Sequence, residues 1–388
     1  MSVLFCVPAI GQEQILKQKI AGLCLWERLY QHAKRAGMTP LFILGSDSSL
    51  KKSVPDDAYC TDYSKFSCRG FGIVVLCRAD VLPEIECLKY IASVHIPMGH
   101  LLEDKGLAVF SPSKDCLEFE RAFAPDGFHE LLKFVATYME KGPLRCNKGK
   151  IYHAGDPLSI KELEDHLFKG LIKDTEGFMS RHVERRISLF ISKRLVNTSV
   201  TPNQITVIST IIGLIGAFFI SLGQGLPQIF GSILFLVHSI VDGCDGEIAR
   251  IKFMESRLGG VMDFWGDNIV HAAVFWAIGL EWAMRSGALL PLYLGAMAVA
   301  GTFLSAAIVY FTTMRKKTEG PLYTSVSESE QARRKSRLIK VADFLSRRDF
   351  IYLVVILAFL HHLDWFLVAA SFGSIAFAGA LLWIRFKG

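Results

Sequence analysis

Four aspartates lie within one apolar stretch of this chain, and they constrain its fold more than any other feature. The stretch, residues 241–267, reads VDGCDGEIARIKFMESRLGGVMDFWGD. Asp242 and Asp245 are three residues apart and Asp263 and Asp267 are four apart, so each pair can share one face of a helix. Carboxylates in membrane-like surroundings are costly to bury without a cation. The spacing therefore predicts a functional site in which a cation neutralises these acids.

The apolar residues are unevenly distributed, which divides the chain in two. Mean hydropathy is +0.34 and 51% of residues are hydrophobic, and the apolar residues concentrate after about Thr201. Before that point, short β-branched runs alternate with helical stretches, a pattern typical of a wound, parallel α/β sheet. We predict strands at 2–8, 40–44 and 72–77 and helices at 14–37, 129–140 and 156–170.

Six apolar segments follow, and we predict that each spans a membrane. About 20 helical residues cross a bilayer, so the fifth segment is short and the others are long enough. Lys and Arg cluster between the second and third segments and between the fourth and fifth. By the positive-inside rule, this multi-pass protein of the cell membrane has both termini in the cytoplasm. The predicted spans are residues 203–222, 228–250, 258–284, 289–313, 350–363 and 365–384.

Basic amphipathic patterns flank these spans. In residues 175–199 apolar residues recur at helical spacing between Arg and Lys, which favours a helix on the membrane surface over a solvated linker. Residues 325–348 show a similar pattern. The sequence thus predicts three parts: a soluble α/β domain at 1–170, a juxtamembrane helix at 171–199 and an all-α transmembrane domain at 200–388.

Charge and cysteine content limit the classes of partner. The net charge is +6, and because Lys and Arg cluster beside the apolar spans we expect membrane lipids or phosphorylated ligands rather than nucleic acid. Eight of the nine cysteines precede residue 147, and none forms a CxxC pair, so neither a zinc site nor a redox motif has the required spacing. We expect reduced thiols in a cytoplasmic domain.

The predicted topology places all four aspartates near the cytoplasmic ends of spans two and three, in a cavity that a soluble ligand can reach. Ligation by oxygen alone favours Mg²⁺ or Mn²⁺, and four carboxylates can hold two ions, as in enzymes that act on phosphorus centres. Gly246 and Gly259 allow close approach of a ligand or helix, and Arg250 supplies a positive charge for a diphosphate.

The complete pattern, D-x2-D-G-x2-A-R-x8-G-x3-D-x3-D, resembles the signature of the CDP-alcohol phosphotransferase (CDP-alcohol phosphatidyltransferase) family. The resemblance extends over about residues 175–388 and includes the TPNQIT run at 201–206. It implies six transmembrane helices, a homodimer, and transfer of a substituted phosphate from a CDP-alcohol donor to an acceptor alcohol with release of CMP, a step of phospholipid biosynthesis. By this resemblance Asp242, Asp245, Asp263 and Asp267 are metal ligands, Asp267 is also the base, and Gly246, Ala249, Arg250 and Gly259 bind the nucleotide.

The arrangement of domains is similar to archaeal members that use inositol-phosphate chemistry and carry a fused cytidylyltransferase. The acceptor is therefore expected to be an inositol phosphate or another polyol phosphate. Basic residues that could bind its phosphate, or anchor the protein to anionic lipids, are Arg186, Lys193, Arg257, Lys316 and Arg348.

The first domain departs from active members of the sugar-nucleotidyltransferase-like class that its start resembles. Those members have a glycine-rich loop with a basic residue after the first strand. Here Gly11 stands alone, and Asp80 is either a remnant metal ligand or a turn residue. We predict a cytidylyltransferase-like domain that has lost catalysis. Two alternatives remain open: a bifunctional enzyme that also makes its CDP-alcohol, and a cation transporter.

Overall fold

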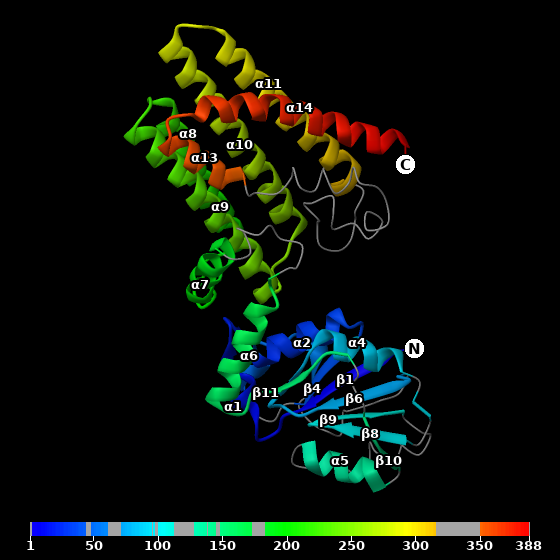
Figure 1. Cartoon of the computed structure of the whole chain (residues 1–388). Coiled ribbons are helices and arrows are strands. Elements are labelled where there is room, and N and C mark those ends of the chain that lie inside the picture. The colour runs from blue at the N-terminus through cyan, green and yellow to red at the C-terminus, as the bar shows by residue number, and fades with distance from the viewer. Residues whose placement is uncertain are drawn as a thin grey trace. The chain divides into compact units, whose positions relative to one another are not determined.

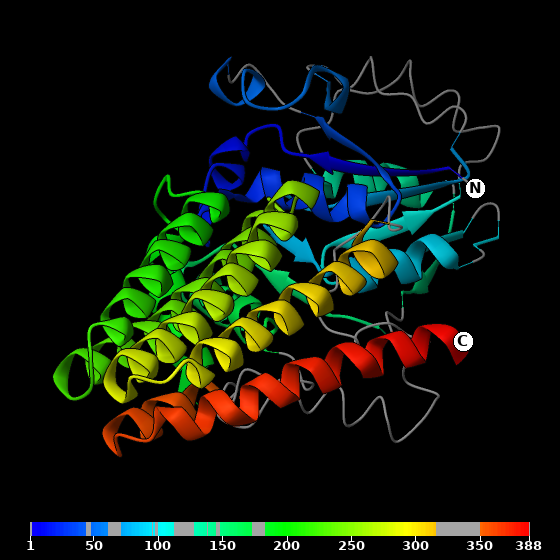
Figure 2. The ribbon, with the colours of Figure 1, turned by 90° about the horizontal axis from the view of Figure 1, so that it is seen from above.

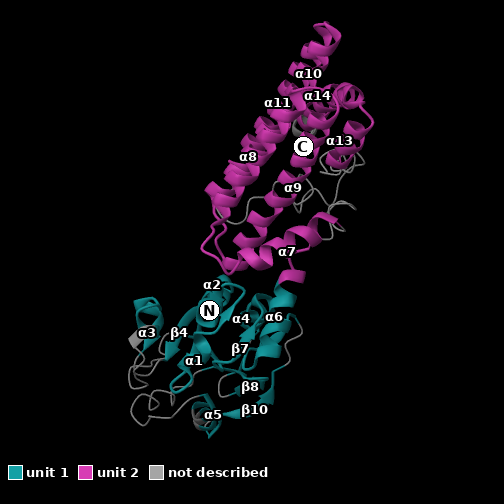
Figure 3. Cartoon of the chain, turned by 90° about the vertical axis from the view of Figure 1, so that its left-hand side faces the viewer, with its two compact units in different colours: residues 1–167 teal, residues 168–388 magenta. Residues whose placement is uncertain are grey.

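The computed structural model of the chain contains two compact units, residues 1–167 and 168–388 (Figure 3). The structure describes residues 2–43, 48–60, 71–94, 96–97, 100–111, 128–137, 139–144, 148–172, 183–315 and 350–387. The amphipathic helix predicted at 325–348 lies outside these residues, as does part of the one predicted at 175–199.

Unit 1 is built on a seven-stranded sheet with the order β10-β8-β9-β6-β1-β4-β5. Six strands run in one direction, and β9 runs antiparallel to both of its neighbours. The predicted parallel sheet is therefore correct except at β9. A two-residue turn, Lys105 and Gly106, joins β8 to β9, and both residues have positive φ, as tight hairpin turns require. The strands are β1 (Val3–Pro8), β4 (Thr39–Ile43), β5 (Tyr59–Cys60), β6 (Ile73–Cys77), β8 (His100–Asp104), β9 (Leu107–Phe110) and β10 (Glu140–Pro143).

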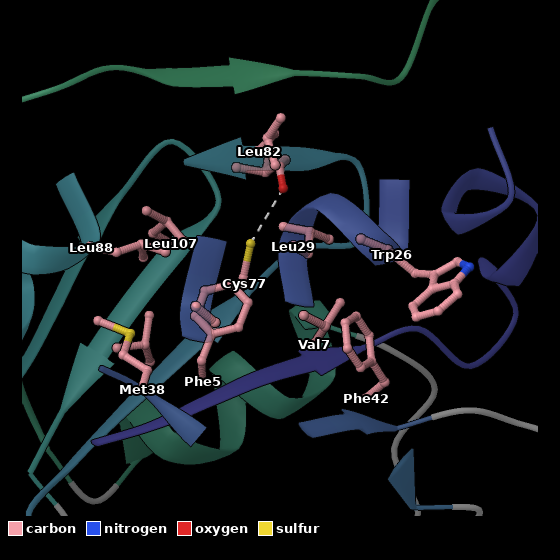
Figure 4. Close-up of a cluster of buried hydrophobic side chains, with 14 of the residues drawn as sticks. Phe5, Val7, Trp26, Leu29, Met38, Phe42, Cys77, Leu82, Leu88 and Leu107 are labelled. Carbon is pink, nitrogen blue, oxygen red and sulfur yellow. Dashed lines mark hydrogen bonds between the residues drawn. The ribbon is translucent and has the colours of Figure 1, made fainter. Parts of the chain in front are cut away.

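The sheet of unit 1 is buried on both faces, which explains why its central strands are continuously apolar. Alternate residues of β1 enter different cores: Phe5 and Val7 pack on one face, Leu4 and Cys6 on the other. Helices α2 (Leu25–Arg35) and α4 (Ile85–Ser93) cover the first face, where Trp26, Leu29 and Leu88 join Phe5 (Figures 1 and 4). Helix α5 (Phe128–Thr137) covers the second.

The single helix predicted at 14–37 is wrong. The chain forms α1 (Glu13–Leu16), a small hairpin of β2 (Lys19–Ile20) and β3 (Leu23–Cys24), and then α2. Ala21 and Gly22 have φ of 44° and 82°, which a helix cannot accommodate. The buried guanidinium of Arg28 stabilises the turn by donating to the carbonyls of Ile20 and Ala21 at 2.8 and 3.0 Å.

The remaining elements of unit 1 are short. They are α3 (Ser48–Lys51), a 3-10 turn (Asp56–Ala58), and β7 (Val81–Pro83) paired with β11 (Ile151–His153). The longer helix α6 (Pro157–Lys169) follows and crosses the boundary between the units at Leu167. Asp156 caps α6 by accepting from the amides of Leu158 and Ser159. Cys87 is disulfide-bonded, which corrects the prediction of uniformly reduced thiols, whereas Cys6, Cys24, Cys77 and Cys244 are free thiols.

Unit 2 is helical, with a helix at each of the six predicted spans. Four of them, α8, α9, α11 and α14, are long and apolar enough to cross a membrane. Helix α10 has 30 residues but carries several charges, and the described part of α13 has only ten. The helices are α7 (Arg185–Leu195), α8 (Pro202–Ser221), α9 (Leu226–Lys252), α10 (Arg257–Ser286), α11 (Leu290–Val309) with a π-helical turn (Tyr310–Met314), α13 (Phe350–Phe359) and α14 (Leu363–Lys387).

Helices α8 and α9 form the most extensive pair in unit 2, and α10 packs against α8 (Figures 1 and 2). Gly216 and Gly231 allow the two backbones of the pair to touch: a Cβ on Gly231 would lie 2.5 Å from the carbonyl oxygen of Gly216. Helix α11 packs on α10 and α14, whereas α7 and α13 pack on α9. The acidic stretch thus lies where α7 and α8 pack on α9 and α10 packs on α8.

Candidate metal and diphosphate site

Three of the four predicted ligands converge. Carboxylate oxygens of Asp242, Asp245 and Asp263 all lie within 4.8 Å of one another. Asp242 and Asp245 are 3% and 7% exposed, and Asp263 is half-buried. Three closely spaced, largely buried carboxylates repel one another unless a cation lies between them. Their oxygen-only donor set fits a hard divalent ion such as Mg²⁺ or Mn²⁺.

Hydroxyl groups of α8 orient two of these carboxylates. Thr206 Oγ1 forms a short hydrogen bond to Asp245 Oδ2, and Ser209 Oγ lies 3.4 Å from Asp242 Oδ1. The start of α8 is fixed by a capping box, in which Thr201 and Gln204 exchange side-chain-to-backbone hydrogen bonds. The TPNQIT run therefore sets the register that brings Thr206 against α9.

The connection between α9 and α10 brings Asp263 back toward the first two ligands. Phe253 ends α9 in the left-handed conformation, with φ of 56°, and Ser256 caps α10 by accepting from the amide of Gly259 at 3.0 Å. A Cβ on Gly259 would lie 2.9 Å from Asn203 Oδ1. The absence of a side chain at Gly259 thus lets the start of α8 approach this connection.

Arg250 lies one turn beyond Asp245 on α9. Its Nη1 is 3.2 Å from where a Cβ of Gly246 would be, so the glycine leaves room for the guanidinium against the helix. Arg250 Nε is buried and has no hydrogen-bond partner among the described residues. A buried, unsatisfied guanidinium donor is unusual and indicates an anionic ligand. Ala249 is half-buried beside it.

Asp267, the fourth predicted ligand, lies outside the group of three and faces His238. His238 is 1% exposed, and its Nε2 lies 3.5 Å from Asp267 Oδ1. Its Nδ1 lies 2.9 Å from the backbone carbonyl oxygen of Ser209. Because a carbonyl oxygen can only accept a hydrogen bond, Nδ1 must be the donor and carries a proton. The carbonyl thereby fixes the imidazole ring with Nε2 toward Asp267.

Several residues of the site were not predicted from the sequence. They belong to three groups: the hydroxyls of α8, the buried histidine of α9, and a buried carboxylate, Glu247, with its partners on α7. The i, i+3 spacing of Thr206 and Ser209, which matches that of Asp242 and Asp245, is the sequence signal that could have identified the first group.

Of the basic residues suggested for the acceptor, Arg186, Lys193 and Arg257 are exposed, and Lys316 and Arg348 lie outside the described residues.

With this geometry in place, comparison with known proteins identifies the class. Residues 199–377, which include α8, α9, α10 and the carboxylate group, match the CDP-alcohol phosphatidyltransferase family. This part of the chain belongs to that family.

Among curated proteins, a 118-residue segment is 42% identical to the bifunctional IPC transferase and DIPP synthase of Thermococcus kodakarensis, covering 30% of this chain and 26% of that protein. A 95-residue segment is 32% identical to the archaetidylinositol phosphate synthase of Pyrococcus horikoshii, covering 24% of this chain and 49% of that protein. The chain thus matches less than half the length of each.

Among solved structures, the phosphatidylinositol phosphate synthase of Mycobacterium tuberculosis with CDP-DAG bound matches with 18% identity and a TM-score of 0.31, over 51% of this chain and 88% of that one.

Proposed function

We propose that the chain is a metal-dependent membrane transferase that moves a substituted phosphate from a CDP-alcohol to an acceptor alcohol and releases CMP. The convergence of Asp242, Asp245 and Asp263, near an Arg250 whose buried Nε has no hydrogen-bond partner among the described residues, is the observation that carries this proposal. A site that combines cation ligands with a fixed arginine suits a diphosphate, whereas a cation-conducting path needs no such arginine.

In this proposal, each residue of the site has a separate role in the reaction. Asp242, Asp245 and Asp263 would hold the metal, which, when bound, neutralises charge on the diphosphate. Arg250 donates to the same phosphates and stabilises the charge that develops on departing CMP. The acceptor oxygen attacks the phosphorus distal to cytidine, and Asp267, held opposite His238, takes the proton of the acceptor hydroxyl. We propose one or two Mg²⁺ or Mn²⁺ ions.

The substrate class follows from the relatives. Curated relatives are named for inositol-phosphate products, so we propose an inositol phosphate or another polyol phosphate as the acceptor. The charge asymmetry of the connections supports a site that opens to the cytoplasm, with both termini on that side. We also propose that the chain has six transmembrane spans, forms a homodimer and binds membrane lipids.

A panel assay tests this function. The full chain in detergent, given CDP-alcohol donors against inositol-phosphate and polyol-phosphate acceptors, should release CMP and form a product whose mass equals donor plus acceptor minus CMP. Removal of divalent ions with a chelator should stop CMP release, and Mg²⁺ or Mn²⁺ should restore it. No CMP release with any donor, together with metal-dependent cation flux in vesicles, would favour a transporter instead.

A second candidate function is that unit 1 makes the CDP-alcohol itself, because several curated relatives are named as bifunctional. Against it, Arg78 pairs with Asp80 through both carboxylate oxygens, so the predicted remnant metal ligand is already neutralised. We therefore expect the full-length Asp263→Asn variant, in which the transferase is disabled, to leave CTP unchanged in the presence of polyol phosphates. Pyrophosphate release from CTP in that variant would establish the bifunctional alternative.

A further inference from the structure

Glu247 is a fully buried carboxylate within the acidic stretch, at a position to which the sequence pattern assigns no role. Its exposed fraction is 0%, and it lies on α9 between Gly246 and Ile248. Three groups of α7 donate to it: Ser188 Oγ and Ser192 Oγ at 2.6 Å each, and Arg185 Nη1 at 2.9 Å. A buried carboxylate is retained at low cost only when it is satisfied in this way.

The contact between α7 and α9 includes these polar groups. Ser188 and Ser192 are 1% and 0% exposed and face α9, whereas Ile187 and Phe190 on the same helix are 42% and 57% exposed. Other apolar residues of the helix, Ile191 and Leu195, pack beside the serines against the buried cluster that contains Cys244 and Ile248. Helix α7 therefore leaves apolar side chains available for lipid and uses Glu247 to fix its position on α9.

The same contact places a second guanidinium close to the first. Arg185 Nη1 lies 3.4 Å from where a Cβ of Gly243 would be, and Arg250 Nη1 lies 3.2 Å from the corresponding point at Gly246. Gly243 and Gly246 are three residues apart on one side of α9 and directly follow Asp242 and Asp245. The side chain of Arg185 remains 19% exposed. Two positive charges thus lie over two glycines about one helical turn apart on α9, the helix that carries Asp242 and Asp245.

We propose that Arg185 is a second contact for the phosphates of the CDP-linked donor, and that Glu247 is a positioning residue which clamps α7 to α9 to hold Arg185 beside Arg250. This inference rests on the proposed transferase function. It makes α7 part of the donor site and not only a membrane anchor. Two guanidinium groups of like charge are more stable side by side when anions lie close to both, and a diphosphate adds negative charge to that of Glu247.

Arg185→Gln is the first test, because glutamine can still donate to Glu247 but carries no charge. We expect the KM for the CDP-alcohol donor to rise by about 10- to 100-fold, the loss typical of a hydrogen bond to a charged group. The KM for the acceptor should change little, and Arg185→Lys should recover part of the donor affinity. Arg194→Gln is the matched control, since Arg194 lies on the same helix and stacks on exposed Phe190; its donor KM should equal that of the wild type.

Glu247→Gln tests the positioning role. The amide fills the same space and accepts from one serine, but it no longer pairs with Arg185, so the donor KM should rise as it does in Arg185→Gln. Because both changes disturb one interaction, the double variant should be no worse than the single variants. A purely structural role would lower the melting temperature and the active fraction in detergent but leave the donor KM of the folded enzyme unchanged.

The outcomes separate the two proposals. Wild-type protein that releases no CMP from any CDP-alcohol would refute the proposed function. Active wild type, with a donor KM in Arg185→Gln within about twofold of both the wild type and Arg194→Gln, would refute the role of Arg185 while leaving the transferase intact. A changed donor KM in Arg185→Gln with an unchanged one in Glu247→Gln would refute the positioning role of Glu247.

Discussion

Asp263→Asn is expected to reduce CMP release by roughly 10³-fold or more, comparable to the loss of a group that stabilises charge in a transition state. Asp263 is the one member of the carboxylate group that comes from α10, so it closes the site against Asp242 and Asp245. Asparagine keeps the shape and one oxygen but removes the negative charge that a divalent ion needs. The fold should persist, because relieving repulsion among three carboxylates offsets the lost interactions.

The measurement is steady-state CMP release in detergent over a range of Mg²⁺ and Mn²⁺ concentrations, with size-exclusion chromatography to check folding. Asp364→Asn is the matched control: it is the same change at the start of α14, where Asp364 lies 3.8 Å from His362. The control should retain activity. Normal turnover by Asp263→Asn at ordinary metal concentrations would contradict the assigned role.

The spacing of the aspartates predicted their convergence because helical periodicity and a short connection leave few alternatives. Asp242 and Asp245 share a face of α9, and residues 253–256 reverse the chain so that the first turns of α10 return beside them. The separate position of Asp267 was not predictable, since it depends on which side of α10 faces His238. That contact requires the packing of α8, α9 and α10 together, which periodicity alone does not specify.

Glu247 illustrates what a sequence pattern misses. A glutamate beside the predicted ligands looks like one more acid of the same site, and the apolar recurrence in residues 175–199 predicts that the helix packs or binds lipid through its apolar face. The structure adds a polar contact to the second expectation: Ser188 and Ser192 are buried against α9, while Phe190 stays exposed. Two serines four residues apart in a basic helix were the available signal, but their partner lies more than 50 residues away in sequence.

In unit 1 the sequence predicted the buried strands well and the chain reversals poorly. The continuous apolar runs at 2–8 and 72–77 require a sheet covered on both faces, which β1 and β6 confirm. The break near Ala21 was missed because local helical periodicity continues on both sides of it. Only the positive φ values there, and the guanidinium of Arg28 that holds the turn, show that the helix cannot pass through.

Gly231→Ala is expected to destabilise unit 2 and lower activity, although alanine is the better helix former. Alanine improves helix propensity by about 1 kcal/mol. At Gly231, however, the new methyl group would lie 2.5 Å from the carbonyl oxygen of Gly216 and 2.8 Å from the backbone nitrogen of Ile220. Backbone atoms cannot move aside as a side chain can, so α8 and α9 must separate, at a cost of roughly 1–3 kcal/mol or more. Separation also withdraws Thr206 from Asp245.

Gly373→Ala is the matched control for this prediction, because a Cβ at that helical position has no atom within 4 Å. The same substitution should therefore be neutral or raise the melting temperature in detergent, whereas Gly231→Ala should lower it by several degrees. Gly231→Ala should also need more Mg²⁺ for half-maximal CMP release, since Asp242 and Asp245 lie on the helix that is displaced. If both variants shift the melting temperature upward, close packing of α8 on α9 is not what holds the carboxylates in place.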